Sequence, residues 1–260
     1  MINADDFGFT PDVNAGIIHA HREGVLTSTT LMANGEAFDD AARLAREAPT
    51  LDIGCHLVLV QGRSLISGRP YPETVQQTIV ALAKGRLDVY AELRAQIEKI
   101  IAAGIRPTHL DSHKHTHIVP GIFRVVARLA NEFGIPYVRL PLDRTAPLAR
   151  LPCAVAEPYY RRVARQYKVR MTDHFLGFRL TGSLTEDSLA AALCSLREGT
   201  TEFMCHPGFL GPELEQARTR LKESRVRELE ALTSARIRKI MAAESIRLVA
   251  FCNTDSNSRT

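Results

Sequence analysis

Residues 89–141 read "VYAELRAQIEKIIAAGIRPTHLDSHKHTHIVPGIFRVVARLANEFGIPYVRLP", and helical and strand patterns alternate along this stretch. Helical periodicity covers 89–103 and 122–133, and each pattern ends before a glycine, a common helix stop. "THLDSHKHTHIVP" at 108–120 predicts a strand that runs into a loop, and "PYVRLP" at 136–141 predicts another strand. Strands that are joined through helices pair in parallel, so this stretch predicts βαβ units.

The same alternation extends through the rest of the chain. The sequence predicts further helices at 13–23, 38–47, 74–82, 186–196 and 225–243, and further strands at 2–4, 26–32, 51–60, 201–208 and 246–251. Residues 142–182 contain several prolines and predict loops with one or two helices. Six or seven such units favour a barrel, complete or incomplete, over the alternative of a doubly wound open sheet. No linker or repeat divides the chain, so one domain is expected over residues 1–260.

Composition narrows the classes of function. At 45% hydrophobic and 24% charged residues, the sequence is typical of a globular protein, and no apolar run is long enough to span a membrane. The net charge is +4, but like charges form no block and there is no Trp, which argues against nucleic-acid binding. The five cysteines include no C-x-x-C pair, and from the opening "MINADDFG" we expect no signal peptide. We therefore expect a reducing compartment, the cytoplasm.

Polar clusters coincide with the carboxyl ends of predicted strands. They comprise Asp5, Asp6, His56, Asp111, His113, His115, His117, Arg139 and His206. In barrels and open α/β sheets these strand ends form the active face. The sequence therefore predicts that these side chains share one face of the protein.

The adjacent carboxylates of "NADDFG" suggest a division of labour. Successive side chains on a strand point in opposite directions, so one of Asp5 and Asp6 can bind a metal while the other acts as a base. The alternative is a turn with two solvated aspartates, since Asp and Gly favour turns.

The histidines offer both ligands and a proton donor. His113, His115 and His117 share one face if their strand continues, or converge in a loop if the chain turns. His56, in the apolar "GCHLVLV", is a candidate ligand or a buried core histidine. His206, in "EFMCHPG", can donate a proton near neutral pH, or can be a capping or buried residue.

Arg139 is a further candidate on the "PYVRLP" strand. It can clamp a carboxylate or hold the base in place. The alternative is a structural ion pair.

Four motifs in this order, "NADDFG", "GCHLVLV", "THLDSHKHTH" and "EFMCHPG", make the sequence resemble the YdjC-type carbohydrate deacetylases, which include chitooligosaccharide deacetylases. The segments "LTSTTLMANG", "HLVLVQGRSLI" and "VRLPL" resemble the branch associated with hopanoid lipid biosynthesis. The resemblance implies a distorted TIM-like (β/α) barrel. The family usually has several apolar residues before its aspartate pair, so we expect either a short first strand here or a native start upstream of Met1.

The resemblance also implies roles for the candidate residues. Asp6, His56 and His113 match the metal site, Asp5 the catalytic base and His206 the general acid. Substrate-binding or supporting positions fall to Asp111, His115, His117 and Arg139. One divalent ion is expected, Mg²⁺ by resemblance and Zn²⁺ by ligand chemistry.

The implied substrate is an N-acetylglucosamine-type amino sugar, attached to a hopanoid lipid. Basic residues between Arg144 and Arg170 are interleaved with apolar ones, which suits peripheral contact with the inner membrane face. The alternative for this segment is an ordinary solvated surface. Rival functions are a deacetylase of soluble chito-oligosaccharides, a phosphoesterase, and a non-catalytic sugar- or lipid-binding protein. The sequence leaves the oligomeric state open, and a homo-oligomer is compatible with it.

Overall fold

The computed structural model describes residues 1–257 except 141, 144 and 146–149, and the side chains of 150–154 and 255–257 also lie outside the description. Seven strands form one parallel sheet in the order β5-β4-β3-β2-β1-β7-β6. The strands are β1 Ile2–Phe7, β2 Ser28–Leu31, β3 Asp52–Leu57, β4 His109–Ser112, β5 Tyr137–Val138, β6 His174–Leu176 and β7 Thr201–Cys205.

The two edges of this sheet are linked through Arg170, which lies just before β6. Its carbonyl accepts a hydrogen bond from Val138 N at 2.9 Å, and its own N–H donates to Pro136 O at 2.8 Å. The sheet therefore curls round toward closure, as a distorted TIM-like barrel does. The barrel prediction is confirmed.

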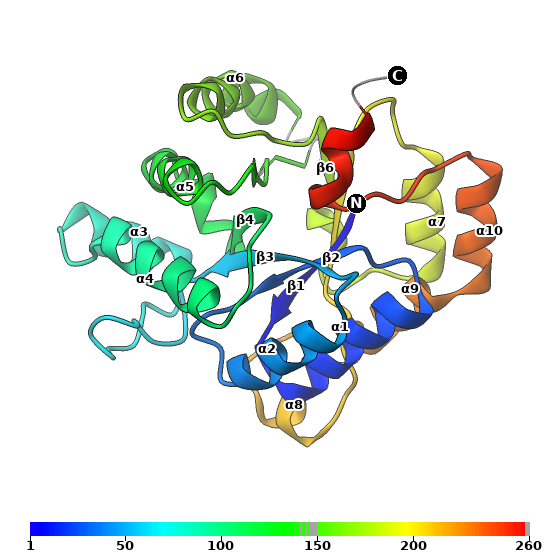
Figure 1. The fold of residues 1–260 in the computed structure, drawn as a ribbon, viewed down its shortest axis with the longest axis horizontal. Coiled ribbons are helices and arrows are strands. Elements are labelled where there is room, and N and C mark those ends of the chain that lie inside the picture. The colour runs from blue at the N-terminus through cyan, green and yellow to red at the C-terminus, as the bar shows by residue number, and fades with distance from the viewer. Residues whose placement is uncertain (141, 144, 146–149, 258–260) are drawn as a thin grey trace.

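Helices surround the sheet (Figure 1). They are α1 Pro11–Glu23, α2 Phe38–Glu47, α3 Val75–Ala83, α4 Val89–Ala102, α5 Pro120–Glu132, α6 Arg150–Gln166, α7 Glu186–Cys194, α8 Pro212–Gln216, α9 Glu223–Thr233 and α10 Ala235–Ala243. In the described part of the chain they are accompanied by the 3₁₀ segments η1 His113–Ile118, η3 Phe178–Leu180 and η4 Phe251–Asn257. Helix α5 illustrates the packing, since Ile122, Val126 and Leu129 form a buried apolar stripe at helical spacing.

The interior of the barrel is polar, in contrast to its apolar outer layer. Asn3, Asp5, Asp111, Arg139 and Glu202 are all buried. Buried charges require partners, so these residues form a connected network. The candidate functional site lies at this network.

Several boundaries differ from the sequence predictions. The first strand reaches Phe7, so Asp5 and Asp6 lie within it rather than after it. Residues 108–120, predicted as a strand that runs into a loop, form β4 up to Ser112, and the chain then turns into η1. Strand β6 lies in a segment that predicted only loops and helices, because three residues are too few for a visible alternation.

The C-terminal region was predicted less well. The helix expected over 225–243 is two helices, because Ser234 leaves the helical conformation and caps α10 through Arg236 N. The expected strand over 246–251 does not form, and η4 begins at Phe251. The apolar residues of this segment still pack, since Phe251 stacks on His109 at 3.9 Å between ring centres.

Two predictions made from the composition, on membrane spans and on disulfides, can be compared with the structure. Within the described part of the chain, no helix has the length and apolar character needed to cross a membrane. Cys55, Cys194, Cys205 and Cys252 are all free thiols. The basic segment from Arg144 falls partly outside the described residues, because Arg144 and the side chain of Arg150 are not described.

Candidate active site

A bulge near the end of β1 directs its two aspartates. The β1–β2 register shifts between Ala4 and Phe7, and Asp6 adopts a left-handed backbone with φ 71°. Such a conformation is uncommon for a residue other than glycine and often marks a functional position. As a result Asp5 faces the barrel interior, while Asp6 reaches the histidines at the carboxyl edge of the sheet.

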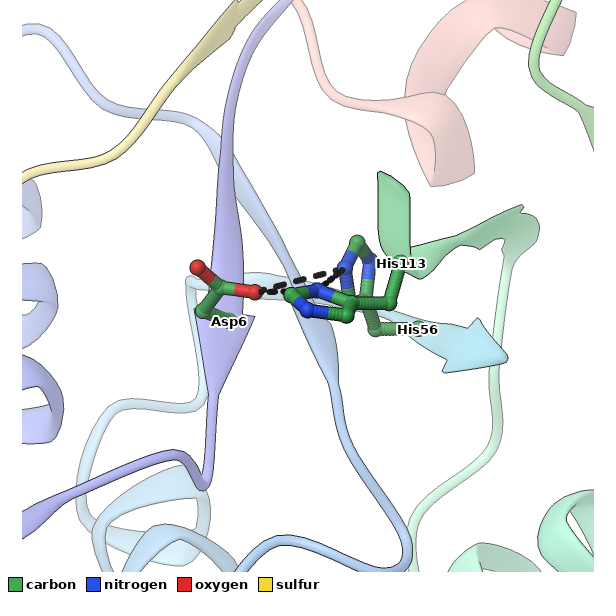
Figure 2. Close-up of side chains that lie close together, drawn as sticks. All are labelled: Asp6, His56 and His113. Atoms are coloured by element: carbon green, nitrogen blue, oxygen red, sulfur yellow. Dashed lines mark hydrogen bonds and ion pairs between the residues drawn. The ribbon is translucent and has the colours of Figure 1, made fainter. Parts of the chain in front are cut away.

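Asp6, His56 and His113 bring three ligand atoms together (Figure 2). Asp6 Oδ1 lies 3.0 Å from His113 Nδ1 and 3.4 Å from His56 Nε2. The two ring nitrogens are 3.3 Å apart. The three residues come from β1, β3 and the turn after β4, so the fold alone unites them.

The dimensions of this triangle suit a metal ion. Ligands bound at about 2.1 Å stand about 3.0 Å apart in octahedral geometry and about 3.4 Å apart in tetrahedral geometry. The observed separations of 3.0, 3.3 and 3.4 Å span that interval. One carboxylate and two imidazoles form a donor set that suits several divalent ions, so the residues present fit a single metal.

Asp111 fixes the orientation of His56. Its Oδ1 lies 2.7 Å from His56 Nδ1, and its Oδ2 accepts a hydrogen bond from Thr30 Oγ1 at 3.0 Å. A proton on Nδ1 leaves Nε2 free to face Asp6 and His113. Burial opposes a charge on the ring, but the neighbouring Asp111 carboxylate raises the pKa of His56 to about 10. The surroundings of His56 therefore favour positive charge, which either a proton on Nε2 or a metal ion in its place would supply.

Arg139 holds Asp5 from inside the barrel. Its Nη1 and Nη2 donate to the two Asp5 oxygens at 2.8 and 2.7 Å. The same guanidinium contacts Asp111 at 2.8 Å and Glu202 at 2.7 Å. Burial would raise the pKa of Asp5, but Arg139 outweighs this and holds that pKa well below its usual range.

The arrangement around Arg139 also bears on a second metal. Asp5, His56 and Asp111 offer another group of closely spaced ligand atoms. Both of these carboxylates already bind the Arg139 guanidinium, which supplies the positive charge. A second cation would have to compete with it, so the geometry favours one metal.

Further support for Asp5 comes from two residues that the sequence analysis did not select. Asn3 Nδ2 donates to Asp5 Oδ1 at 3.1 Å, and Asn3 Oδ1 lies 2.9 Å from His109 Nε2. Burial lowers the pKa of His109 well below its usual value, so its ring is neutral. A neutral ring can donate from Nε2 to the Asn3 oxygen, which fixes the orientation of the Asn3 amide.

His206 lies in the turn after β7, on the same side as Asp6. It is buried, and its backbone N–H donates to Glu228 Oε2 at 2.5 Å. Its ring Nδ1 stands 4.0 Å from the same oxygen. Burial lowers the pKa of His206 to about 4, so the ring is neutral at neutral pH.

Arg225 and Glu228, on α9, were missed by the sequence analysis. Arg225 Nη2 donates to Asp6 Oδ2 at 2.5 Å, the oxygen that does not face the histidines. Burial raises the pKa of Glu228 to about 7. A signal was available, because these charges occupy the buried stripe that Leu229 and Leu232 continue.

His115 and His117 do not join the ligand triangle. The chain turns at Lys114 and His115, both left-handed, so the three histidines diverge. His117 Nδ1 lies 2.5 Å from Ser112 Oγ, and the His115 ring packs edge-on against Phe178 with 4.9 Å between centres. Of the three alternating histidines, the structure brings only His113 to Asp6 and His56.

Fold and site together define a class: a (β/α) barrel with one candidate metal centre at the carboxyl ends of its strands, next to an arginine-bound carboxylate. Comparison with known proteins narrows this class. The family model described as YdjC-like protein matches residues 1–243. The chain therefore belongs to the YdjC-like family.

Named relatives match over nearly the full length. A carbohydrate deacetylase of Geobacillus stearothermophilus is 34% identical, with 96% of each chain covered. A chitooligosaccharide deacetylase of Salmonella typhimurium is 37% identical, covering 96% of this chain and 97% of the relative. A crystal structure from Enterococcus faecalis, of a protein whose name proposes cellobiose-phosphate cleavage, superposes with a TM-score of 0.80 at 28% identity. It covers 96% of each chain.

Proposed function

We propose that this chain is a metal-dependent carbohydrate N-deacetylase, one domain over residues 1–260. The observation that carries the proposal is the triangle of Asp6, His56 and His113 beside the arginine-bound Asp5. The names of the Geobacillus and Salmonella relatives support the reaction class.

In this proposal Asp6, His56 and His113 hold one divalent ion. Such an ion lowers the pKa of water and polarises an acyl carbonyl, which answers the poor nucleophilicity of water toward an amide. Family resemblance favours Mg²⁺ and the imidazole donors favour Zn²⁺. Titrating each metal into metal-free protein and measuring both affinity and turnover decides between them.

Asp5 is the proposed base. The bidentate contact with Arg139 keeps its carboxylate ionised and in place, but it also lowers the proton affinity of Asp5. Proton transfer to Asp5 therefore requires water that has been made more acidic, which is what a bound ion would supply. Arg139 also fixes its direction, and Asn3 supports it from the other side.

His206 is the proposed donor to the departing amine nitrogen. Because its ring is neutral at the start, it must gain a proton before it can give one. In one turnover Asp5 takes one proton from water and His206 gives one proton to the amine nitrogen. Once Asp5 has released its proton and His206 has regained one, both residues are back in their starting states.

The test separates the roles of the two aspartates. Asp5→Asn should retain the metal and slow the chemical step by about 10²–10⁴-fold, because the base is lost. Asp6→Asn and His113→Ala should weaken metal binding itself. Undiminished turnover of N-acetylglucosamine-bearing compounds after thorough chelation would overturn the metal requirement. If Asp5→Asn lost the metal and Asp6→Asn kept it, the roles of the two aspartates would be exchanged.

We further propose that the amino sugar is attached to a hopanoid-type lipid, with the enzyme in the cytoplasm and in peripheral contact with the inner membrane face. The resemblance of "HLVLVQGRSLI" to that branch supports this, as do the arginines of α6. One of them, Arg161, donates to Glu157 at 2.6 Å, which reduces the charge available to a membrane. Efficient deacetylation of soluble chitobiose, with the glycosylated hopanoid untouched, would overturn the lipid proposal alone.

A further inference from the structure

We propose that helix α9 positions both sides of the active site, with Arg225 orienting the Asp6 carboxylate and Glu228 orienting the His206 ring. The inference rests on the proposed function, since it assigns Asp6 to the metal and His206 to proton donation. Arg225 and Glu228 are positioning residues, because each acts on the site through another side chain.

Arg225 approaches Asp6 from the side opposite the two histidines. Its side chain is 1% exposed, its Nη2 donates to Asp6 Oδ2, and its Nε donates to Leu221 O at 3.3 Å. With Oδ2 held in this way, the carboxylate cannot rotate, and Oδ1 remains directed at His56 and His113. The guanidinium therefore selects which oxygen of Asp6 the metal meets.

Glu228 lies one helical turn further along α9 and serves His206. Its Oε2 accepts a hydrogen bond from the His206 backbone N–H and stands 4.0 Å from ring Nδ1. That ring nitrogen is buried and has no hydrogen-bond partner among the described residues. A small rotation of the ring would bring Nδ1 to Glu228 and aim Nε2 away from it, as a donor to substrate requires.

The helix itself is firmly packed. Leu229 and Leu232 anchor it in the core, and it lies along α1 (Figure 1). Gly208 brings the turn after His206 against Arg225, because a Cβ at that position would lie 3.1 Å from Arg225 Cδ. Functional side chains on a packed helix are held more accurately than those on a loop.

Metal affinity tests the Arg225 half of the proposal. Arg225→Lys keeps the charge but cannot contact Asp6 and Leu221 O at once, so we expect the Kd for Zn²⁺ to rise about 10–100-fold. Calorimetric titration of Zn²⁺ into metal-free protein measures it, and Arg227→Lys, on the exposed face of the same helix, is the matched control. If Arg225→Lys does not fold, Arg225→Gln replaces it. A Kd within twofold of the parent protein would overturn this half.

Turnover at saturating Zn²⁺ tests the Glu228 half. Glu228→Gln should leave the Kd for Zn²⁺ unchanged, lower kcat about 10–100-fold and leave KM within threefold, because only the orientation of His206 is lost. The exposed Glu230→Gln is its control. An unchanged kcat, or a loss confined to KM, would overturn it. A parent protein that binds Zn²⁺ without deacetylating N-acetylglucosamine oligomers or their lipid-linked forms would instead count against the proposed function, while the Arg225 test still stands.

Discussion

Replacement of Arg139 by Met removes the one guanidinium that three buried carboxyl groups share. Arg139 lies 2.7 Å from Asp5, 2.8 Å from Asp111 and 2.7 Å from Glu202. Removing one partner of a buried ion pair costs about 3–5 kcal/mol, since a charge is left buried without compensation. With three carboxyl groups affected, Arg139→Met should lose about 5 kcal/mol of unfolding free energy at about pH 8.

The loss should depend on pH in a defined direction. Burial already raises the pKa of Glu202 to about 7, and without Arg139 it rises further. The pKa of Asp5, which Arg139 holds below its usual range, rises as well because burial then acts on it unopposed by the guanidinium. A carboxyl group whose folded pKa is raised gains stability as pH falls, because the folded protein binds the proton more tightly than the unfolded chain. The deficit should therefore shrink between about pH 8 and about pH 5.5.

Urea unfolding followed by circular dichroism measures this deficit at both pH values, with the exposed Arg128→Met as the control. A loss below about 1 kcal/mol at both pH values would refute the view that Arg139 neutralises the barrel interior.

Two further predictions concern the framework of the site. Burial lowers the pKa of His117 to about 3, so below its unfolded value of about 6.5 the unfolded chain binds a proton that the folded protein excludes. Relative to His117→Gln, the parent should therefore lose about 2 kcal/mol of unfolding free energy between about pH 7 and about pH 5, and parallel pH profiles would contradict this. Gly16→Ala should destabilise the protein by about 1–3 kcal/mol and lower kcat, because the new Cβ would lie 2.4 Å from Gly208 Cα, close to His206. A raised melting temperature would mean that the helix-propensity gain prevails.

The barrel and its candidate metal cluster could be predicted from the sequence because both leave local marks. Parallel strands buried on both sides appear as short apolar runs between helical patterns, and a histidine or aspartate at the end of such a run stands out. Asp6, His56 and His113 stood out as candidates in this way, the family resemblance implied that they form the metal site, and the structure brings their ligand atoms together.

The direction of side chains beyond a strand end could not be predicted in the same way. Alternation placed His113, His115 and His117 together only if the strand continued. Two consecutive left-handed residues, Lys114 and His115, turn the chain instead. Neither Lys nor His specifies that conformation by itself, and the hydrogen bond from His117 N–H to Ser112 Oγ that closes the turn is not visible in a residue pattern.

The supports of the site escaped prediction for a different reason: they occupy positions that resemble core positions. Glu202 lies inside β7, and Arg225 and Glu228 lie on the buried stripe of α9. A charged residue at such a position must have a partner, but which partner it has depends on contacts between distant parts of the chain. Asp6 and Arg225, for example, are 219 positions apart in the sequence.

The interior of the barrel contains an unusual number of buried ionisable side chains. Five carboxyl groups, those of Asp5, Asp6, Asp111, Glu202 and Glu228, are buried around the two guanidinium groups of Arg139 and Arg225. Burial is the main cause of the raised pKa values of Glu202 and Glu228, both about 7, and it favours their neutral forms. The pKa of His56 is raised, against the effect of burial, by the neighbouring Asp111 carboxylate. A well-packed apolar interior would be at least as stable as such a cluster. The triangle of Asp6, His56 and His113 lies beside this cluster and shares His56 with the group formed by Asp5 and Asp111, so a divalent cation held there would add positive charge next to it.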